Sequence, residues 1–378
     1  MRSTRRRAGA ATIAVSAAMS VAVTAVPSAA WAGATADGPV RITARGYHNG
    51  QVQIDISESN GSYRMVDPTR PGLQCGGVNG QPLIFAKQPS PWPGNPSAEM
   101  FAACVDIMYG AQRNWDMQRD WMSRYGHNGS GRAIPARYDP NLTGPGGYLG
   151  GYIVFGRIRQ GRPATPLDLV GREYGHVVFQ NSPGGAGSGN ENGGLNEGTA
   201  DIIGTLTEHF AANPKDIPDY TIGEKVGDLV GGPYLRSMYN PSLRGDPNCY
   251  SASIPSTEVH AAAGPLNHWF YLLAEGSNPG GGKPDSPICI GDVPPVPGIG
   301  IRKAALVYMG ALMRKTRGWR YTDARSSAAQ SVLALYGGGG SECPAASAAW
   351  NAVTVPRGPG DPGCITPPTP PPSPISAP

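Results

Sequence analysis

Two segments in the middle of the chain constrain its fold most strongly, because each places polar side chains one helical turn apart. In the first, Arg172 and His176 are four residues apart and would face the same way on a helix. In the second, Glu197 and Asp201 have the same spacing. A lone histidine on a helix face is more often structural than a ligand. The second segment offers a carboxylate ligand and a partner for it, so together the two segments predict a pair of helices carrying an ion site.

The sequence changes character near Thr165, from alternating apolar and polar residues to helical spacing. Before this point we expect strands within 38–67 and 133–158, and one long helix from Pro96 to about Tyr125. After it, helices are predicted at 167–179, 195–212, 261–275, 299–316, 322–336 and 343–353. The chain is therefore expected to be an α+β protein, with a β-rich N-terminal half and a helical C-terminal half.

The first 32 residues have the features of a secretory signal peptide. A basic head precedes an apolar stretch at 8–26, and Ala30-Trp31-Ala32 fits a cleavage site. A transmembrane anchor is the alternative, but serine, threonine and glycine dilute the apolar stretch. Removing the four arginines of this segment leaves 27 basic and 27 acidic residues. This balance gives no support for binding to nucleic acid or acidic membranes, and no later run is apolar enough to span a bilayer.

The six cysteines agree with an exported protein. They are even in number and form no Cys-x-x-Cys pair, which makes zinc fingers improbable. Six cysteines allow about fifteen connectivities, which the sequence alone cannot distinguish. We predict pairing between neighbours along the chain: Cys75–Cys104, Cys249–Cys289 and Cys343–Cys364. The proline-rich segment 366–378 is expected to be a linker or stalk.

The motif REYGH at 172–176 is followed by GGLNEGTADIIGTLTEH, LRSMYNPSL and VHAAAGPLNHWFYLL. In content and order, these stretches resemble the thermolysin-like neutral metallopeptidases, and the resemblance covers nearly the whole mature sequence. It implies a two-lobed fold with the active-site cleft between a lobe at 38–180, which ends in the REYGH helix, and a helical lobe at 181–357. It also implies a secreted monomer that acts on a polypeptide substrate or binds a peptide ligand.

The resemblance also implies roles for individual residues. His176 and Glu197 would be zinc ligands, Asn196 and Asp201 would orient the ligands, and Glu173 would be the general base. His260 would stabilise the oxyanion, and Arg236 would hold the substrate carbonyl. The family's calcium ligands match Asp168, Glu208, Asp219 and Glu224. Glu208 follows Glu197 by about three helical turns on the same face, although ordinary surface acids are the alternative interpretation.

The sequence departs from the family at several site positions. Arg172 replaces the first histidine of His-Glu-x-x-His, and a guanidinium has no lone pair to offer a metal. The edge strand that binds substrate falls on 145–148, where its asparagine is missing. Pro255 replaces an aspartate that orients the catalytic histidine, a role for which Glu258 is a possible substitute. The short stretch after the signal peptide leaves no room for the family's large inhibitory propeptide.

Two functions follow from these departures. The first is a pseudopeptidase that retains the fold and its calcium, has weak or no hydrolysis, and acts as a peptide-binding protein. The second is a working zinc endopeptidase of extracellular proteins. Without zinc, Glu197 and Asp201 would be two unneutralised carboxylates in a cleft. We therefore predict that Arg172 forms an ion pair with Glu197, Asp201 or both, in place of the metal.

Overall fold

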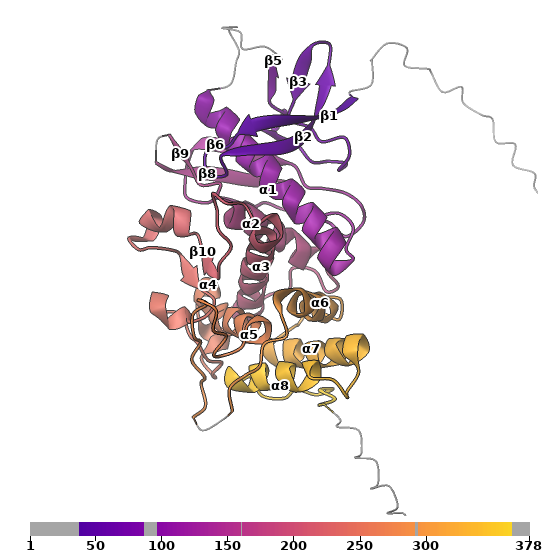
Figure 1. Ribbon diagram of the computed structural model, residues 1–378, viewed down its shortest axis with the longest axis vertical. Helices are drawn as coiled ribbons and strands as arrows, with labels where there is room; N and C mark the ends of the chain where they lie inside the picture. The colour runs from indigo at the N-terminus through magenta and orange to yellow at the C-terminus, as the bar shows by residue number, and fades with distance from the viewer. Residues whose placement is uncertain (1–37, 87–96, 160, 292–293, 365–378) are drawn as a thin grey trace, which may run out of the picture. The chain divides into compact units, whose positions relative to one another are not determined.

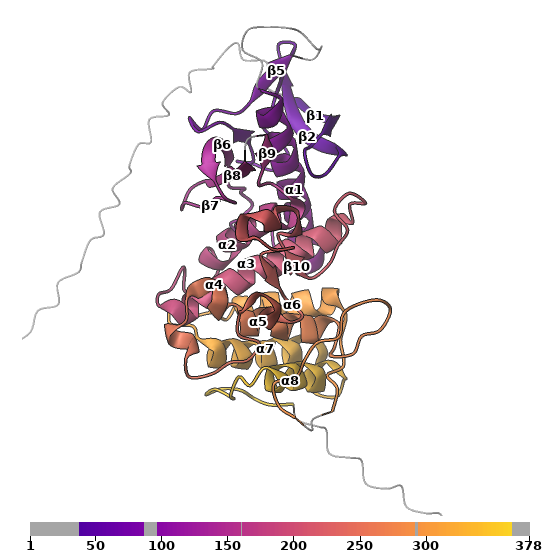
Figure 2. The ribbon, with the colours of Figure 1, turned by 90° about the vertical axis from the view of Figure 1, so that its left-hand side faces the viewer.

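A computed structural model of the chain describes residues 38–86, 97–159, 161–291 and 294–364 (Figure 1). The predicted signal peptide and the proline-rich segment 366–378 lie outside these residues. In both views strands β1–β9 and the first helix occupy one end of the described chain and the last helices the other (Figures 1 and 2). The second and third helices lie between them. The expected α+β architecture is confirmed.

The N-terminal half contains two small sheets. One has the order β1-β2-β3-β5 and is antiparallel. The other has the order β4-β6-β8-β7, with parallel pairs β4/β6 and β6/β8, and β9 also pairs with β8. The bounds are β1 Gly38–Arg45, β2 Gln51–Ser59, β3 Ser62–Arg64, β4 Cys75–Gly76, β5 Ile84–Ala86, β6 Ala136–Thr143, β7 Gly147–Tyr148, β8 Ile153–Arg159 and β9 Arg162–Pro163.

The long helix α1 (Ala98–Met122) supports the first sheet. Alternate residues of β2, such as Ile54 and Ile56, are fully buried and join Val105 and Met108 of α1 in one hydrophobic core. The predicted first helical residue, Pro96, lies outside the described residues. The helix begins at Ala98 as described, and the side chain of Ser97 accepts a hydrogen bond from the backbone N–H of Met100 and caps this end.

Helices α2 (Leu167–Gln180) and α3 (Asn190–Ala211) pack directly on each other and carry the two segments identified above. Their approach depends on glycine. A Cβ on Gly175 would lie 2.6 Å from the Cα of Ala200, and a Cβ on Gly204 would lie 2.6 Å from the backbone oxygen of Asp168. Any larger residue at either position would force the helices apart, so these glycines fix how closely the two polar segments face each other.

The C-terminal half is helical around its own core, in which the rings of Trp269 and Trp350 stack with centroids 4.3 Å apart. The helix predicted at 261–275 is instead two helices, since Pro265 at the start of the second cannot continue the first. Short strands β10 and β11 pair with each other. The bounds are β10 Thr221–Ile222, β11 Arg236–Ser237, α4 Val259–Ala262, α5 Gly264–Ala274, α6 Ile301–Leu312, α7 Tyr321–Tyr336 and α8 Glu342–Ala352.

All three predicted disulfides are present, joining Cys75 to Cys104, Cys249 to Cys289 and Cys343 to Cys364. The first ties β4 to α1, and the third ties the start of α8 to the end of the described chain. No helix within the described ranges is long and apolar enough to cross a membrane.

Candidate active site

A polar cleft of about 250 Å³ opens where β7, α2, α3 and α4 meet. It is lined by Gly146, Gly147, Tyr148, Arg172, Glu173, His176, Gln180, Asn196, Glu197 and His260. The predicted gathering of Glu173, His176, Glu197 and His260 in one site is therefore confirmed. Gln180 was not predicted to line the cleft. Its position one turn beyond His176, on the same face of α2, could have identified it.

Arg172 contacts three carboxylates in this cleft. Its Nη1 donates to Glu173 Oε1 at 2.7 Å, and its Nε donates to Asp201 Oδ1 at 3.0 Å. Its Nη2 donates to Glu197 Oε2. The side chain of Arg172 is only 8% exposed, so water screens these pairs little. The predicted ion pairs of Arg172 with Glu197 and with Asp201 are both confirmed.

Asp201 is fully buried and is shared between two arginines. Arg236 donates to it through Nε (2.8 Å) and Nη2 (2.6 Å), and Asn267 donates from its side-chain amide at 2.8 Å. Burial acts to raise the pKa of Asp201, but Arg236 and Arg172 outweigh it and lower the pKa to about 2. Arg236 is thus held by Asp201 and does not line the cleft, so its role toward substrate stays a prediction.

Two histidines flank Glu197. The Nε2 atoms of His176 and His260 lie 3.8 and 3.5 Å from Glu197 Oε2. Asn196 Oδ1 lies 3.1 Å from His176 Nδ1, where the resemblance places a residue that orients the ligand. Glu258 Oε1 lies 2.7 Å from His260 Nδ1, which is the contact that a substitute for the missing aspartate would make. The site therefore combines two histidines and several carboxylates with a buried guanidinium.

A second cluster of carboxylates is formed by the end of α3 and the segment that follows it. Oxygen atoms of Glu208, Asp216 and Glu224 lie within 4.8 Å of one another. Asp168 is also fully buried, with Oδ2 accepting from the N–H of Gly223 at 2.6 Å. Burial first, and then repulsion from neighbouring acids, raises the pKa values of Asp168, Glu208 and Glu224.

Asp216 was missed by the sequence analysis, which selected Asp219. The Asp219 carboxylate instead accepts from the N–H and hydroxyl of Thr221 and is not one of the three converging groups. The sequence feature that could have identified Asp216 is that the loop between Glu208 and Glu224 contains a second acidic residue besides Asp219. Lys225 Nζ lies 3.5 Å from Asp216 Oδ1 and neutralises part of the cluster's charge.

Two known domain families match most of the chain. Residues 41–180 match the thermolysin metallopeptidase catalytic domain, and residues 188–355 match the thermolysin metallopeptidase alpha-helical domain. The chain belongs to the thermolysin metallopeptidase family. Its two halves correspond to the two domains of that family, a β-rich catalytic domain followed by a helical domain.

Individual relatives within the thermolysin family are moderately similar. The chain is 33% identical over 324 residues to a transglutaminase-activating metalloprotease of Streptomyces mobaraensis, covering 83% of this chain and 42% of that protein. It is 32% identical over 266 residues to bacillolysin of Bacillus cereus, covering 67% of this chain and 44% of that protein. The chain thus spans less than half the length of these relatives.

A solved structure, the precursor of protealysin from Serratia proteamaculans, superposes with a TM-score of 0.55 at 19% identity. The superposition covers 75% of this chain and 87% of that one. At this identity the likeness concerns the fold, which is the two-domain α+β fold of the thermolysin family.

Proposed function

We propose that this protein is a secreted thermolysin-family pseudopeptidase, whose cleft binds polypeptide segments with weak or no hydrolysis. The observation that carries the proposal is the contact of Arg172 with Glu173, Glu197 and Asp201. A buried guanidinium supplies positive charge among these carboxylates, where the family's zinc would supply it. The three disulfides support secretion, because such bonds persist in oxidising compartments.

The residues present do not fit a catalytic zinc site. Such a site takes three protein ligands and keeps a fourth position for water. His176 and Glu197 supply two ligands, but the position one turn before His176 is Arg172, which has no acceptor lone pair. The side chain of Glu173, the family's general base, is 1% exposed, and one of its oxygens accepts from Arg172. These contacts leave the cleft suited to binding and ill suited to activating water.

Metal content and proteolysis test this proposal together. Native protein produced with ample zinc is expected to contain far less than one zinc ion per chain and to leave casein intact. Arg172→His restores the third ligand and should bind about one zinc ion per chain. The matched control is Arg132→His, because Arg132 is exposed and has no ion pair among the described residues. Elemental analysis by mass spectrometry gives the metal content.

The second candidate function, a working zinc endopeptidase of extracellular proteins, is favoured by the retained side chains of Glu173, His176, Asn196 and Glu197. It predicts the opposite result in the same assays. Stoichiometric zinc in the native protein, with casein cleavage abolished by Glu173→Gln, would establish the working enzyme and reject the pseudopeptidase.

We also propose a single calcium ion at the buried acidic cluster. The donor set fits, because calcium takes carboxylate oxygens, and several of these oxygens accept no hydrogen bond from the described residues, although Lys225 lies 3.5 Å from one of them. These unsatisfied atoms are Asp168 Oδ1, Glu208 Oε1, Asp216 Oδ1 and Glu224 Oε2. A bound divalent cation would offset the repulsion among them and hold α2 to α3. Its role is structural, since the cluster shares no residue with the cleft.

A further inference from the structure

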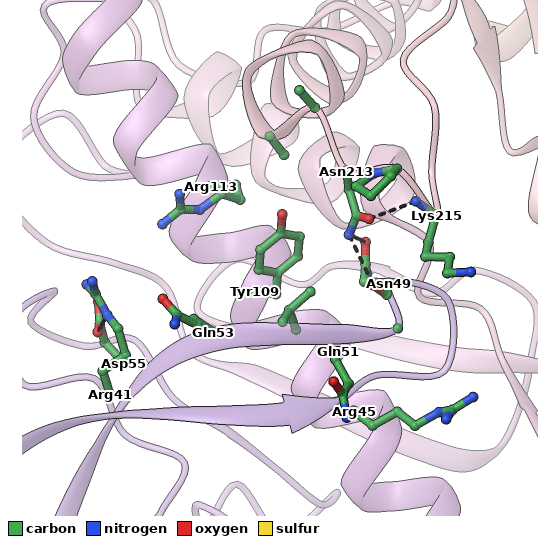
Figure 3. Close-up of a pocket in the computed structure, with 15 residues that line it drawn as sticks. Arg41, Arg45, Asn49, Gln51, Gln53, Asp55, Tyr109, Arg113, Asn213 and Lys215 are labelled. Atoms are coloured by element: carbon green, nitrogen blue, oxygen red, sulfur yellow. Dashed lines mark hydrogen bonds and ion pairs between the residues drawn. The ribbon is translucent and has the colours of Figure 1, made fainter.

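A recess of about 690 Å³ lies outside the cleft, between strand β2, helix α1 and the loop that follows α3 (Figure 3). It shares no lining residue with the cleft. Gln51, Gln53 and Asp55 of β2 form one side, Tyr109 and Arg113 of α1 another, and the 211–215 loop closes one end. Its volume is typical of binding sites for ligands.

Among the strands that the structure describes, none pairs with the part of the β2 edge that borders this recess. On one side β2 pairs with β1, but on the other side β3 pairs only with Ser57–Ser59. At Asp55, the side chain of Gln112 takes the place of a strand. Gln112 Nε2 donates to the backbone oxygen of Asp55 at 2.7 Å, and the Asp55 N–H donates to Gln112 Oε1 at 3.1 Å. The Asp55 peptide groups therefore point away from β1.

The same backbone orientation recurs at every second residue of β2, because of the hydrogen-bond pattern of antiparallel strands. Residues two apart direct their N–H and C=O groups to the same side. Gln53 and Gln51 therefore also direct these groups away from β1, toward the recess. Within the described ranges no strand pairs with them on that side. This edge is open for one more short strand.

The lining of the recess carries more basic than acidic side chains. It includes Arg41, Arg45, Arg113 and Lys215, and a single carboxylate, that of Asp55. Two of these cations are already paired, Arg41 with Asp55 and Arg113 with Asp116 outside the recess. Arg45 and Lys215 have no ion pair within the described part of the chain, and Figure 3 shows both at the same end of the recess. A ligand here should carry negative charge.

We propose that the recess binds an extended acidic peptide, which adds as a short strand to β2 at Gln51 and Gln53. In an extended peptide alternate side chains lie on one face, so acidic residues two apart can approach the unpaired cations together. The segments of this chain outside the described residues contain only two acidic residues, Asp37 and Asp292, which lie in different segments. None of these segments therefore offers acidic residues two apart, and the peptide belongs to another polypeptide. This site does not depend on whether the cleft hydrolyses peptides.

Fluorescence anisotropy tests the proposal, using a labelled probe peptide Val-Asp-Val-Glu-Val-Asp and the full chain in calcium-containing buffer. Arg45→Glu combined with Lys215→Gln is expected to weaken binding by about tenfold or more, because both unpaired charges are lost. The matched control Arg132→Glu removes an exposed arginine of the same half and should change affinity by less than about twofold. Melting temperatures of the variants verify their folding.

A second probe separates strand addition from simple attraction of charge. The same peptide methylated on its central backbone nitrogens keeps every carboxylate but cannot donate to an edge strand, and should bind about tenfold more weakly. Equal affinity of the methylated and unmethylated peptides, or an unchanged affinity of the double variant, would overturn the proposal. Tight binding of polyphosphate without binding of the peptide would also overturn it, in favour of a general polyanion site.

Discussion

Arg172→Met is expected to lower the free energy of unfolding by about 3–5 kcal/mol, because it removes the charge that neutralises a buried carboxylate cluster. Glu173 and Asp201 are almost fully buried, with side chains 1% and 0% exposed, and Glu197 is only 13% exposed. Methionine fills a similar volume, so the cost reflects unpaired charge rather than a cavity. Chemical denaturation at pH 7 with excess calcium measures this difference.

The control for this prediction is Arg41→Met, the same substitution at an exposed ion pair. Arg41 is 62% exposed, and its partner Asp55 keeps a second ion pair with Arg70. Its loss should cost about 0–1 kcal/mol. If Arg172→Met cost no more than Arg41→Met, Arg172 would not be neutralising the cluster, and the central argument for a pseudopeptidase would fail.

The pH dependence of stability offers an independent check on the same cluster. Because the pKa of Asp201 in the folded protein is about 2, below its ordinary value of 3.8, ionised Asp201 stabilises the fold above pH 3.8. This contribution is lost as the pH falls toward 2. We therefore expect the native protein to lose stability over this range, as followed by denaturation at fixed temperature. An Asp201→Asn variant should show a smaller loss.

The site's composition was predictable from sequence because it is local. Arg172 and His176 share one helix, Glu197 and Asp201 share another, and helical geometry fixes which side chains face each other. The prediction of the Arg172 ion pairs also needed the family resemblance, which places both helices at one cleft, and the charge balance of that cleft without zinc. The disulfides were also predicted, since each joins neighbouring cysteines along the chain.

Other features depend on contacts that no local pattern encodes. Asp216 lies in an irregular loop, where spacing does not predict direction, and its place beside Glu208 is set by the path of that loop. The recess is built from β2, α1 and the loop after α3, which lie far apart in sequence. Its open edge exists because β3 is too short to cover the rest of β2. A feature of this kind can be recognised only from the tertiary structure.

Removal of calcium with EGTA is expected to lower the melting temperature by about 5–10 °C, if the ion is normally near saturation. The effect should be greater at pH 8 than at pH 5.5. In the metal-free protein, burial and mutual repulsion raise the pKa values of Asp168, Glu208 and Glu224. The stability linked to their protonation is present at low pH and is lost as the pH rises toward these raised pKa values. At high pH, bound calcium would neutralise the carboxylates that protons neutralise at low pH.

Two amide variants identify the ligands in the same thermal measurement. Asp216→Asn removes a converging carboxylate and should abolish most of the difference between the calcium and EGTA melting temperatures. Asp219→Asn should retain that difference, because the Asp219 carboxylate is engaged with Thr221. The reverse pattern would place the ion at Asp219, as the family resemblance alone suggests. Equal melting temperatures of the native protein in calcium and EGTA at both pH values would show that the cluster is balanced by protons and Lys225 without a metal.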